Sequence, residues 1–170
     1  MDSQITHWYE TLAPGTVLAL PDIDCSADRI ARHSELFDAY HPINTSTDNR
    51  FGRAIAHGPH PVAQAMASVG NLLGECLVAM GQLGPWRFLS PAFVGEVLRA
   101  DATVIERSAG GKQGTVVLEI RITAPDGRVS QIGEAHLIVR RRPREEGAAC
   151  SGPKNTTPCA APPARWSKPT

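Results

Sequence analysis

Length, composition and charge restrict the class of this protein. Its 170 residues suffice for one domain with a substantial hydrophobic core. Basic and acidic side chains number 17 each, so no net charge favours nucleic acid or an anionic membrane as a partner. Residues 1–4 are polar, and we expect no signal peptide. The cysteines lack close metal-ligand spacing and predict reduced thiols in a cytoplasmic protein: Cys25, Cys76, Cys150 and Cys159.

The first third of the chain predicts a strand, a short helix and an irregular segment. A turn at Pro14-Gly15 precedes a strand candidate at residues 16–23. Ser26 is placed as the N-cap of a helix over residues 27–38. Residues 39–56 carry no periodic pattern, and we expect an irregular connection there.

The long, nearly uncharged stretch of residues 61–80 is the most informative segment. Its polar side chains are spaced by four, three and four residues, which puts them on one narrow stripe of a helix: Gln64, Ser68, Asn71 and Glu75. The rest of the circumference is apolar or small, so we predict a helix buried on most sides. The polar stripe and the glycines argue against a membrane span.

Strand candidates follow the turn at Gly84-Pro85. They cover residues 87–93, 97–107, 115–124 and 130–140. The third alternates apolar and polar side chains, and Pro125-Asp126-Gly127 after it has the composition of a hairpin turn. One buried helix with a curved antiparallel sheet wrapped around it is an α+β fold.

The composition changes near Pro143. Residues 143–170 contain many prolines and almost no large apolar side chain except Trp166, so we predict a disordered tail after a domain of residues 1–142. The run Arg140-Arg141-Arg142 just before the tail fits either a phosphate-binding patch or a solvated strand end.

Three segments carry a resemblance that covers roughly residues 8–140. The first is Phe-Gly-Arg-Ala-Ile-Ala-His-Gly at residues 51–58, which leads into the long helix. The second is residues 88–96, with Glu96 where an acid is usual, and the third is the last hairpin at residues 127–140. Together they resemble the hotdog fold, and within it the MaoC-like hydratases and dehydratases of acyl thioesters. The resemblance implies a single hotdog domain.

The same resemblance exposes a missing catalytic pair. The family's hydration motif has an aspartate, two residues, proline, one residue and histidine shortly before the His-Gly segment. With Pro42 as the fixed point, the aspartate position holds Ala39 and the histidine position holds Asn44. Neither side chain transfers a proton near neutral pH. Gly58 corresponds to the residue whose backbone N–H stabilises the enolate oxygen in the family.

Four residues are candidates to replace the missing pair. Asp38 either shifts inward or simply ends its helix, and His41 in the same loop either joins it or faces solvent. His57 carries a proton or else satisfies a loop carbonyl. His60, in the first turn of the long helix, is a general base or a cap on the pocket entrance.

The remaining expectations concern ligands. We expect Asn44 and Tyr40 to contact substrate beside Gly58, and we expect no cofactor and no metal at His57-x-x-His60. A homodimer or heterodimer with another hotdog chain would cover the unpaired sheet edge and place the pockets near the interface.

The resemblance implies a hydratase or dehydratase acting on an acyl thioester of coenzyme A or acyl-carrier protein, or on a derived carbonyl compound, with altered acid and base residues. Two alternatives stay open. One is a non-catalytic binding subunit of a heteromeric hydratase. The other is a hotdog thioesterase, whose carboxylate on the helix would be Glu75. Fold analogy alone does not choose among the three.

Overall fold

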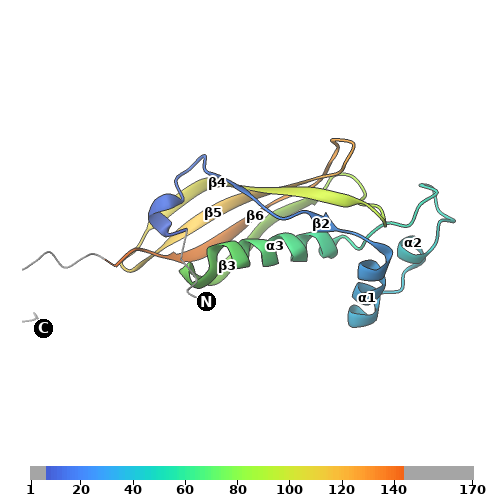
Figure 1. The fold of residues 1–170 in the computed structure, drawn as a ribbon, viewed down its shortest axis with the longest axis horizontal. Helices are drawn as coiled ribbons and strands as arrows, with labels where there is room; N and C mark the ends of the chain where they lie inside the picture. Colours follow the sequence, from blue (N-terminus) through green and yellow to red (C-terminus); the bar gives the residue numbers. More distant parts are fainter. Residues whose placement is uncertain (1–6, 144–170) are drawn as a thin grey trace, which may run out of the picture.

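A curved antiparallel sheet forms most of the structure (Figure 1). The computed structural model describes residues 7–143. The strands follow the order β1-β4-β5-β6-β3, and β2 pairs with β4. Their bounds are Val17–Ala19 for β1, Ile23–Asp24 for β2, Leu77–Phe88 for β3, Val97–Ala109 for β4, Gln113–Thr123 for β5 and Val129–Arg140 for β6. β1 and β3 are therefore the two outer strands of the sheet.

One long helix lies along one face of this sheet, and two short helices lie at one end of it (Figure 1). The long helix is α3, Pro59–Leu73, and the short ones are α1, Ala27–Phe37, and α2, Pro42–Thr45. Short 3₁₀ turns cover Tyr9–Thr11 and Gly74–Cys76. The predicted α+β class, with a sheet curved around one long helix, is confirmed.

The core lies between α3 and the facing side of the sheet. Apolar residues of α3 spaced by four are buried on one side of the helix: Pro61, Ala65, Val69 and Leu73. They belong to the same cluster as the buried side chains of the central strands, such as Leu118, Ile120 and Leu137. Every second residue is buried along much of β5 and β6, so one face of these central strands faces the helix.

The predicted extent of the long helix was wrong at its C-terminal end. The helix stops at Leu73, because Gly74 adopts a positive φ of 51° that ends the α-helical path. Residues 77–80 instead begin β3. The burial prediction was also too broad, since Ala63 and Ala67 are exposed. A short apolar run after a glycine fits a strand as well as a helix, and periodicity alone does not separate them.

Two strand predictions also need correction. The strand placed at residues 87–93 is the end of β3, which starts ten residues earlier, and Leu89 already bonds back to the Ser130 carbonyl at 2.8 Å. The strand placed at 16–23 divides into β1 and β2 around Pro21, which lacks the N–H that a continuous ladder needs. The three later strands and the hairpin at Pro125-Asp126-Gly127 are confirmed, with Gly127 at a φ of 85°.

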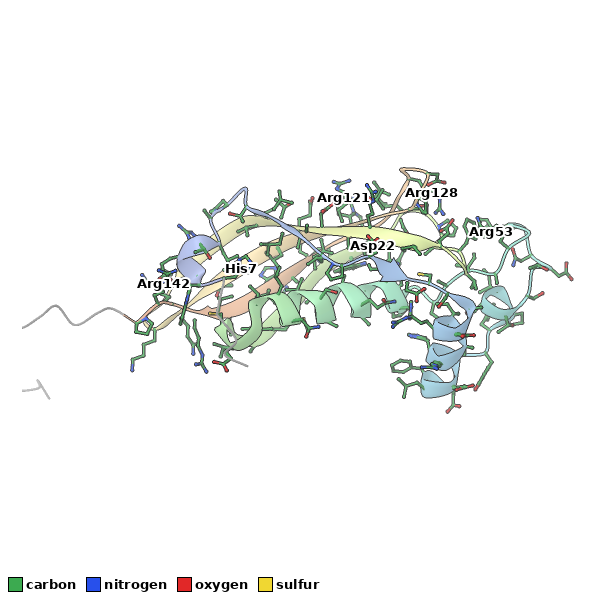
Figure 2. All side chains as sticks on the ribbon, in the orientation of Figure 1. His7, Asp22, Arg53, Arg121, Arg128 and Arg142 are labelled. Atoms are coloured by element: carbon green, nitrogen blue, oxygen red, sulfur yellow. The ribbon has the colours of Figure 1, made fainter. Side chains whose placement is uncertain are left out.

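Glu96, which the sequence places where an acid is usual, holds the fold together at the end of the sheet near α2. Arg128 donates to both of its carboxylate oxygens at 2.8 Å, and the Phe93 N–H donates to it at 3.0 Å. Arg53 adds a longer contact of 3.4 Å. Figure 2 shows Arg53 and Arg128 close to each other at this end. The carboxylate thus ties the β3–β4 connection to the β5–β6 hairpin.

Beyond Pro143, the predicted disordered tail lies outside the described residues, and so do two of the cysteines. Cys25 and Cys76 are buried free thiols. Within residues 7–143, no helix combines the length and the apolar character needed to span a bilayer.

Candidate functional site

A cavity of about 450 Å³ opens at the N-terminal end of α3. It lies where α1, the segment before α2 and the start of α3 meet. Its lining consists of His33, Phe37, Ala39, Asn44, His57, Gly58 and Pro59. The cavity thus brings together Ala39, Asn44 and Gly58, the three positions that the resemblance aligned with the catalytic pair and the oxyanion residue. Among residues 7–143, no carboxylate lines it.

The Gly58 N–H is the unpaired donor at this helix end. Pro59 and Pro61 have no N–H, and the His60 N–H donates to the His57 carbonyl at 2.9 Å. Among the described residues, the Gly58 N–H has no hydrogen-bond partner. The positive end of the α3 dipole adds to its electrostatic effect. An oxygen that gains negative charge in the cavity would be stabilised by this donor.

Gly58 is held in place from two sides. Its carbonyl accepts a hydrogen bond from Gln131 Nε2 at 3.1 Å. The Phe88 ring lies so close that a Cβ at residue 58 would be 3.0 Å from it. A side chain at this position would therefore require a small shift of the ring, and the glycine is favoured here by close approach and not by its backbone conformation.

Three histidines cluster beside the cavity. The rings of His33 and His57 stack, with centroids 4.6 Å apart and planes at 23°. His60 meets His33 edge-on at 5.4 Å. The rings stack rather than converge on a point, and no metal-binding group of three side chains is present within residues 7–143.

His57 has a defined hydrogen-bond partner in Ser34. Ser34 Oγ lies 2.8 Å from His57 Nε2 and 3.1 Å from the Ile30 carbonyl, to which it donates. A hydroxyl has one hydrogen, so when Ser34 donates to the Ile30 carbonyl, His57 Nε2 is the donor in the other bond. The proton then sits on Nε2 and the lone pair on Nδ1. Burial lowers the pKa of His57, and the nearby His60 lowers it further, which favours the neutral ring.

His33 was not among the sequence-predicted residues. Burial lowers the pKa of His33, and the charges that His57 and His60 can carry lower it further. Among the described residues, its ring makes no hydrogen bond. The available signal was its spacing of four from Phe37, which puts both side chains on one face of α1. This spacing points to the cavity only when the packing of α1 beside the start of α3 is known.

His60 lies in the first turn of α3, as expected, and its ring bonds outside the cavity. Its Nε2 lies 3.0 Å from the Asp24 carbonyl and 2.6 Å from Gln64 Nε2, and Gln64 Nε2 also donates to the Asp24 carbonyl at 2.9 Å. His60 lines an adjacent hollow of about 470 Å³ and not the cavity at Gly58. The ring therefore helps to attach β2 to α3.

The structure does not bring Asp38, Tyr40 or His41 to the cavity. Asp38 ends α1 in a left-handed conformation with a φ of 50°, and its side chain is exposed. Tyr40 is 58% exposed. His41 Nδ1 accepts the Ile43 N–H at 3.2 Å and so caps α2.

Asn44, by contrast, does line the cavity. Its side-chain amide donates to the Ile55 carbonyl at 2.7 Å, which fixes the side chain and leaves the amide oxygen for other partners. Glu75 lies in the turn after α3, at the opposite end of a helix that is about 22 Å long. Its carboxylate is therefore remote from Gly58.

Solved structures share this fold. A MaoC-like dehydratase from Rhodospirillum rubrum is 22% identical with a TM-score of 0.68, over 81% of this chain and 99% of that one. The R-hydratase PhaJ1 from Pseudomonas aeruginosa is 19% identical with a TM-score of 0.66, over 79% and 86%. The HadBC (3R-hydroxyacyl-ACP dehydratase) complex from Mycobacterium tuberculosis contains a chain 14% identical with a TM-score of 0.62, over 74% and 96%. No protein-family model and no curated protein matches the chain.

These similarities confirm, for the fold, the resemblance to MaoC-like hotdog proteins that the sequence indicates. The chain is a single hotdog domain over the residues that match. The fold alone does not determine the chemistry, which depends on the residues of the cavity.

Proposed function

We propose that this protein is a MaoC-like hydratase or dehydratase of an acyl thioester or a derived carbonyl compound, with histidines in place of the usual aspartate–histidine pair. One observation carries the proposal: the cavity at Gly58 combines an unpaired N–H donor with the neutral imidazoles of His33 and His57. These are the elements that the reaction needs, an oxyanion donor and groups that exchange protons near neutral pH.

Hydration of an α,β-unsaturated thioester illustrates the roles. A neutral imidazole removes a proton from water while the water oxygen bonds to the β-carbon. The electrons of the carbon–carbon double bond move to the thioester oxygen, whose negative charge the Gly58 N–H stabilises. The imidazolium then returns a proton to the α-carbon and the thioester carbonyl re-forms. Dehydration is the same sequence reversed.

His57 is the leading proton carrier. It lines the cavity, and the hydrogen bond with Ser34 leaves Nδ1 as the basic atom. His33 stacks on it and is the second group able to exchange a proton. Two stacked imidazoles repel each other when both are charged, so at most one of the two rings is an imidazolium at a time.

The thioesterase alternative has less support. Its carboxylate would be Glu75, which is remote from Gly58. A mechanism with Ser34 as the nucleophile would require the Ser34 hydroxyl to leave its hydrogen bonds with Ile30 and His57. Ser34 is 3% exposed, does not line the cavity, and donates its hydroxyl hydrogen to the Ile30 carbonyl. A nucleophile must reach the carbonyl carbon with its base in contact.

The non-catalytic subunit keeps one specific observation in its favour. Ala39 and Asn44 occupy the cavity in place of the catalytic pair, so the cavity can bind a thioester without a carboxylate to act on it. The HadBC dehydratase, which shares this fold, is itself a complex.

We propose that β3 pairs with the β3 strand of a second copy of this chain, or of another hotdog chain. β3 is an outer strand with one unpaired edge. Large apolar side chains on or just after it are exposed: Val78, Met80, Leu83, Phe88 and Leu89. An exposed strand edge with apolar side chains is a surface that proteins normally cover.

The deciding experiment is an assay of the purified full chain on 2-enoyl and 3-hydroxyacyl thioesters. Reversible addition or loss of water, detected by the ultraviolet absorbance of the enoyl thioester, is the expected result. Release of free thiol instead would establish a thioesterase. Water addition that appears only after a second hotdog chain is supplied would establish the subunit function.

A further inference from the structure

A second and larger hollow lies at the other end of the molecule. Its volume is about 1070 Å³. Figure 2 shows Arg142 at this end, opposite to Arg53 and Arg128. The lining consists of Trp8, Glu10, Gly111, Lys112, Gln113, Arg140, Arg141, Arg142 and Pro143. We call this hollow the basic pocket.

The basic pocket concentrates positive charge in a chain whose formal net charge is zero. Among the described residues, four cationic side chains line it against one carboxylate, that of Glu10, whereas the whole sequence has a formal net charge of zero. Within the described residues, the side chains of Lys112, Arg140 and Arg142 form no ion pair. Such a surplus in a concave surface attracts anions, and arginine matches phosphate oxygens in geometry as well as charge.

The carboxylate of Glu10 stays ionised, and its charge is balanced by neighbouring donors. Glu10 accepts from Arg141 Nε at 3.2 Å and from the Arg142 N–H at 3.0 Å. Burial alone would raise the pKa of Glu10, but these donors outweigh it and lower that pKa. Glu10 therefore fixes the run of arginines in place and leaves Arg140 and Arg142 free to meet a ligand.

The wall of the pocket is firmly built. Tyr9 is 6% exposed, and the guanidinium groups of Arg107 and Arg141 lie 5.2 and 5.6 Å from its ring centroid. Arg107 also donates to the Tyr9 carbonyl at 3.0 Å. Trp8, next in the chain, packs against the core and lines the pocket. An indole beside arginines is suited to a ligand that carries both an aromatic base and phosphate groups.

We infer that the basic pocket binds the adenine nucleotide end of coenzyme A, with its phosphates at Arg140, Arg142 and Lys112 and its base against Trp8. The inference rests on the proposed function for the acyl group. It goes further by assigning the carrier and a separate site for it.

The proposed dimer explains how such a distant pocket serves the cavity. Antiparallel pairing of two β3 strands brings the Leu77 end of one protomer to the Phe88 end of the other. Leu77 pairs with Val139, so Arg140 lies at that same end. Phe88 lies against Gly58 in the cavity. The basic pocket of one protomer is thereby placed at the same end of the assembly as the cavity of its partner.

The test measures binding of adenosine 3′,5′-bisphosphate, the nucleotide end of coenzyme A without its thiol arm, to the full chain by titration calorimetry. Replacing Arg140 and Arg142 together with glutamine should weaken binding about tenfold or more, since each loses charge-assisted hydrogen bonds. Both side chains are exposed, and melting temperatures verify folding. Arg99→Gln, an exposed arginine of β4, is the control and should bind like the wild type.

Absence of saturable binding, or equal binding by the double variant, would overturn the inference. Inorganic pyrophosphate binding as tightly as the nucleotide would overturn the assignment to coenzyme A. A kinetic arm separates this inference from the proposed function. The double variant should raise KM for a coenzyme A thioester and leave KM for the N-acetylcysteamine thioester unchanged. Nucleotide binding without any turnover would support the basic pocket and contradict the proposed function. Turnover without nucleotide binding would support the proposed function and contradict the basic pocket.

Discussion

The imidazole rings of His33 and His57 stack face to face at 4.6 Å, next to the unpaired N–H of Gly58. The two side chains come from elements far apart in the sequence, α1 and the segment before α3. Their contact places two titratable rings beside a cavity in which the aligned acid and base positions are Ala39 and Asn44. The stacked pair is therefore the feature on which the proposed chemistry depends.

Replacing His57 with alanine should lower the hydration rate about 100-fold or more, the usual contribution of a positioned acid or base. His33→Gln should give a smaller loss, since one carrier remains. His60→Ala should mainly lower the melting temperature, because His60 bonds the Asp24 carbonyl outside the cavity. Steady-state kinetics and thermal unfolding on the three variants measure this. Full activity of both His57→Ala and His33→Gln would contradict the assignment.

Ser34→Ala separates a positioning residue from a nucleophile. The change leaves the buried His57 Nε2–H without its partner at 2.8 Å, and should cost about 1–3 kcal/mol of stability. The rate should fall less than in His57→Ala, and the pH dependence of the rate should shift because the tautomer is no longer fixed. Complete loss of activity, with a covalent acyl-enzyme trapped in the wild type by mass spectrometry, would instead identify Ser34 as a nucleophile.

The fold was predictable from the sequence because its signals are local. Alternation along residues 115–124, the turn at residues 125–127 and the N-cap position at Ser26 each depend on neighbouring residues, and each agrees with the structure. The Ser26 hydroxyl itself makes no capping bond, so the position was right and its expected chemistry was not. The overlong helix arose where one apolar run spans two elements separated only by Gly74.

The site was predictable only where the resemblance supplied positions. It located Ala39, Asn44, His57 and Gly58, which line one cavity. It could not locate His33, because the contact with His57 depends on how α1 packs against the start of α3. Asp38 and His41 were chosen for closeness in sequence, yet the left-handed residue at the end of α1 turns the chain so that both are exposed.

Activity should decline as the pH is lowered through the depressed pKa values of His33 and His57, because the charged rings no longer accept a proton. Stability should follow the same sign. Below about pH 6.5 the unfolded chain binds protons that the folded rings do not, so the free energy of unfolding falls with decreasing pH. Chemical denaturation from pH 7.5 to about pH 5 measures it. The His33→Gln/His57→Gln double variant should show a shallower fall, and an unchanged slope would contradict the assignment.

Leu83→Arg should convert the proposed dimer to a monomer. Leu83 lies in the middle of β3 and is 47% exposed, so a charge there would be buried in an edge-to-edge pair. Val17→Arg is the matched control, since Val17 is 60% exposed on β1 at the opposite side of the sheet. Sedimentation velocity gives the mass. A wild type that is monomeric, or a dimer unaffected by Leu83→Arg, would refute β3 pairing.

Restoring the missing pair tests whether the cavity is the family's active site. The wild type should hydrate crotonyl-coenzyme A more slowly than an enzyme with the family's pair, because Ala39 and Asn44 leave only His57 and His33 as proton carriers. The double variant Ala39→Asp/Asn44→His adds a carboxylate and an imidazole to the cavity that already contains Gly58. Its rate should rise by about 100-fold or more, the contribution expected of a positioned acid–base group.

The design has two safeguards. Asn44 donates to the Ile55 carbonyl at 2.7 Å, so thermal unfolding must establish that the double variant remains folded. A third variant, Ala39→Asp/Asn44→His with Gly58→Ala, adds a methyl group 3.0 Å from the Phe88 ring, at the residue that carries the proposed oxyanion donor. It should lose the gained rate. A folded double variant that is no faster than the wild type would show that positions 39 and 44 do not act on a thioester bound in this cavity. If the wild type is also inactive, that result would favour the binding-subunit function.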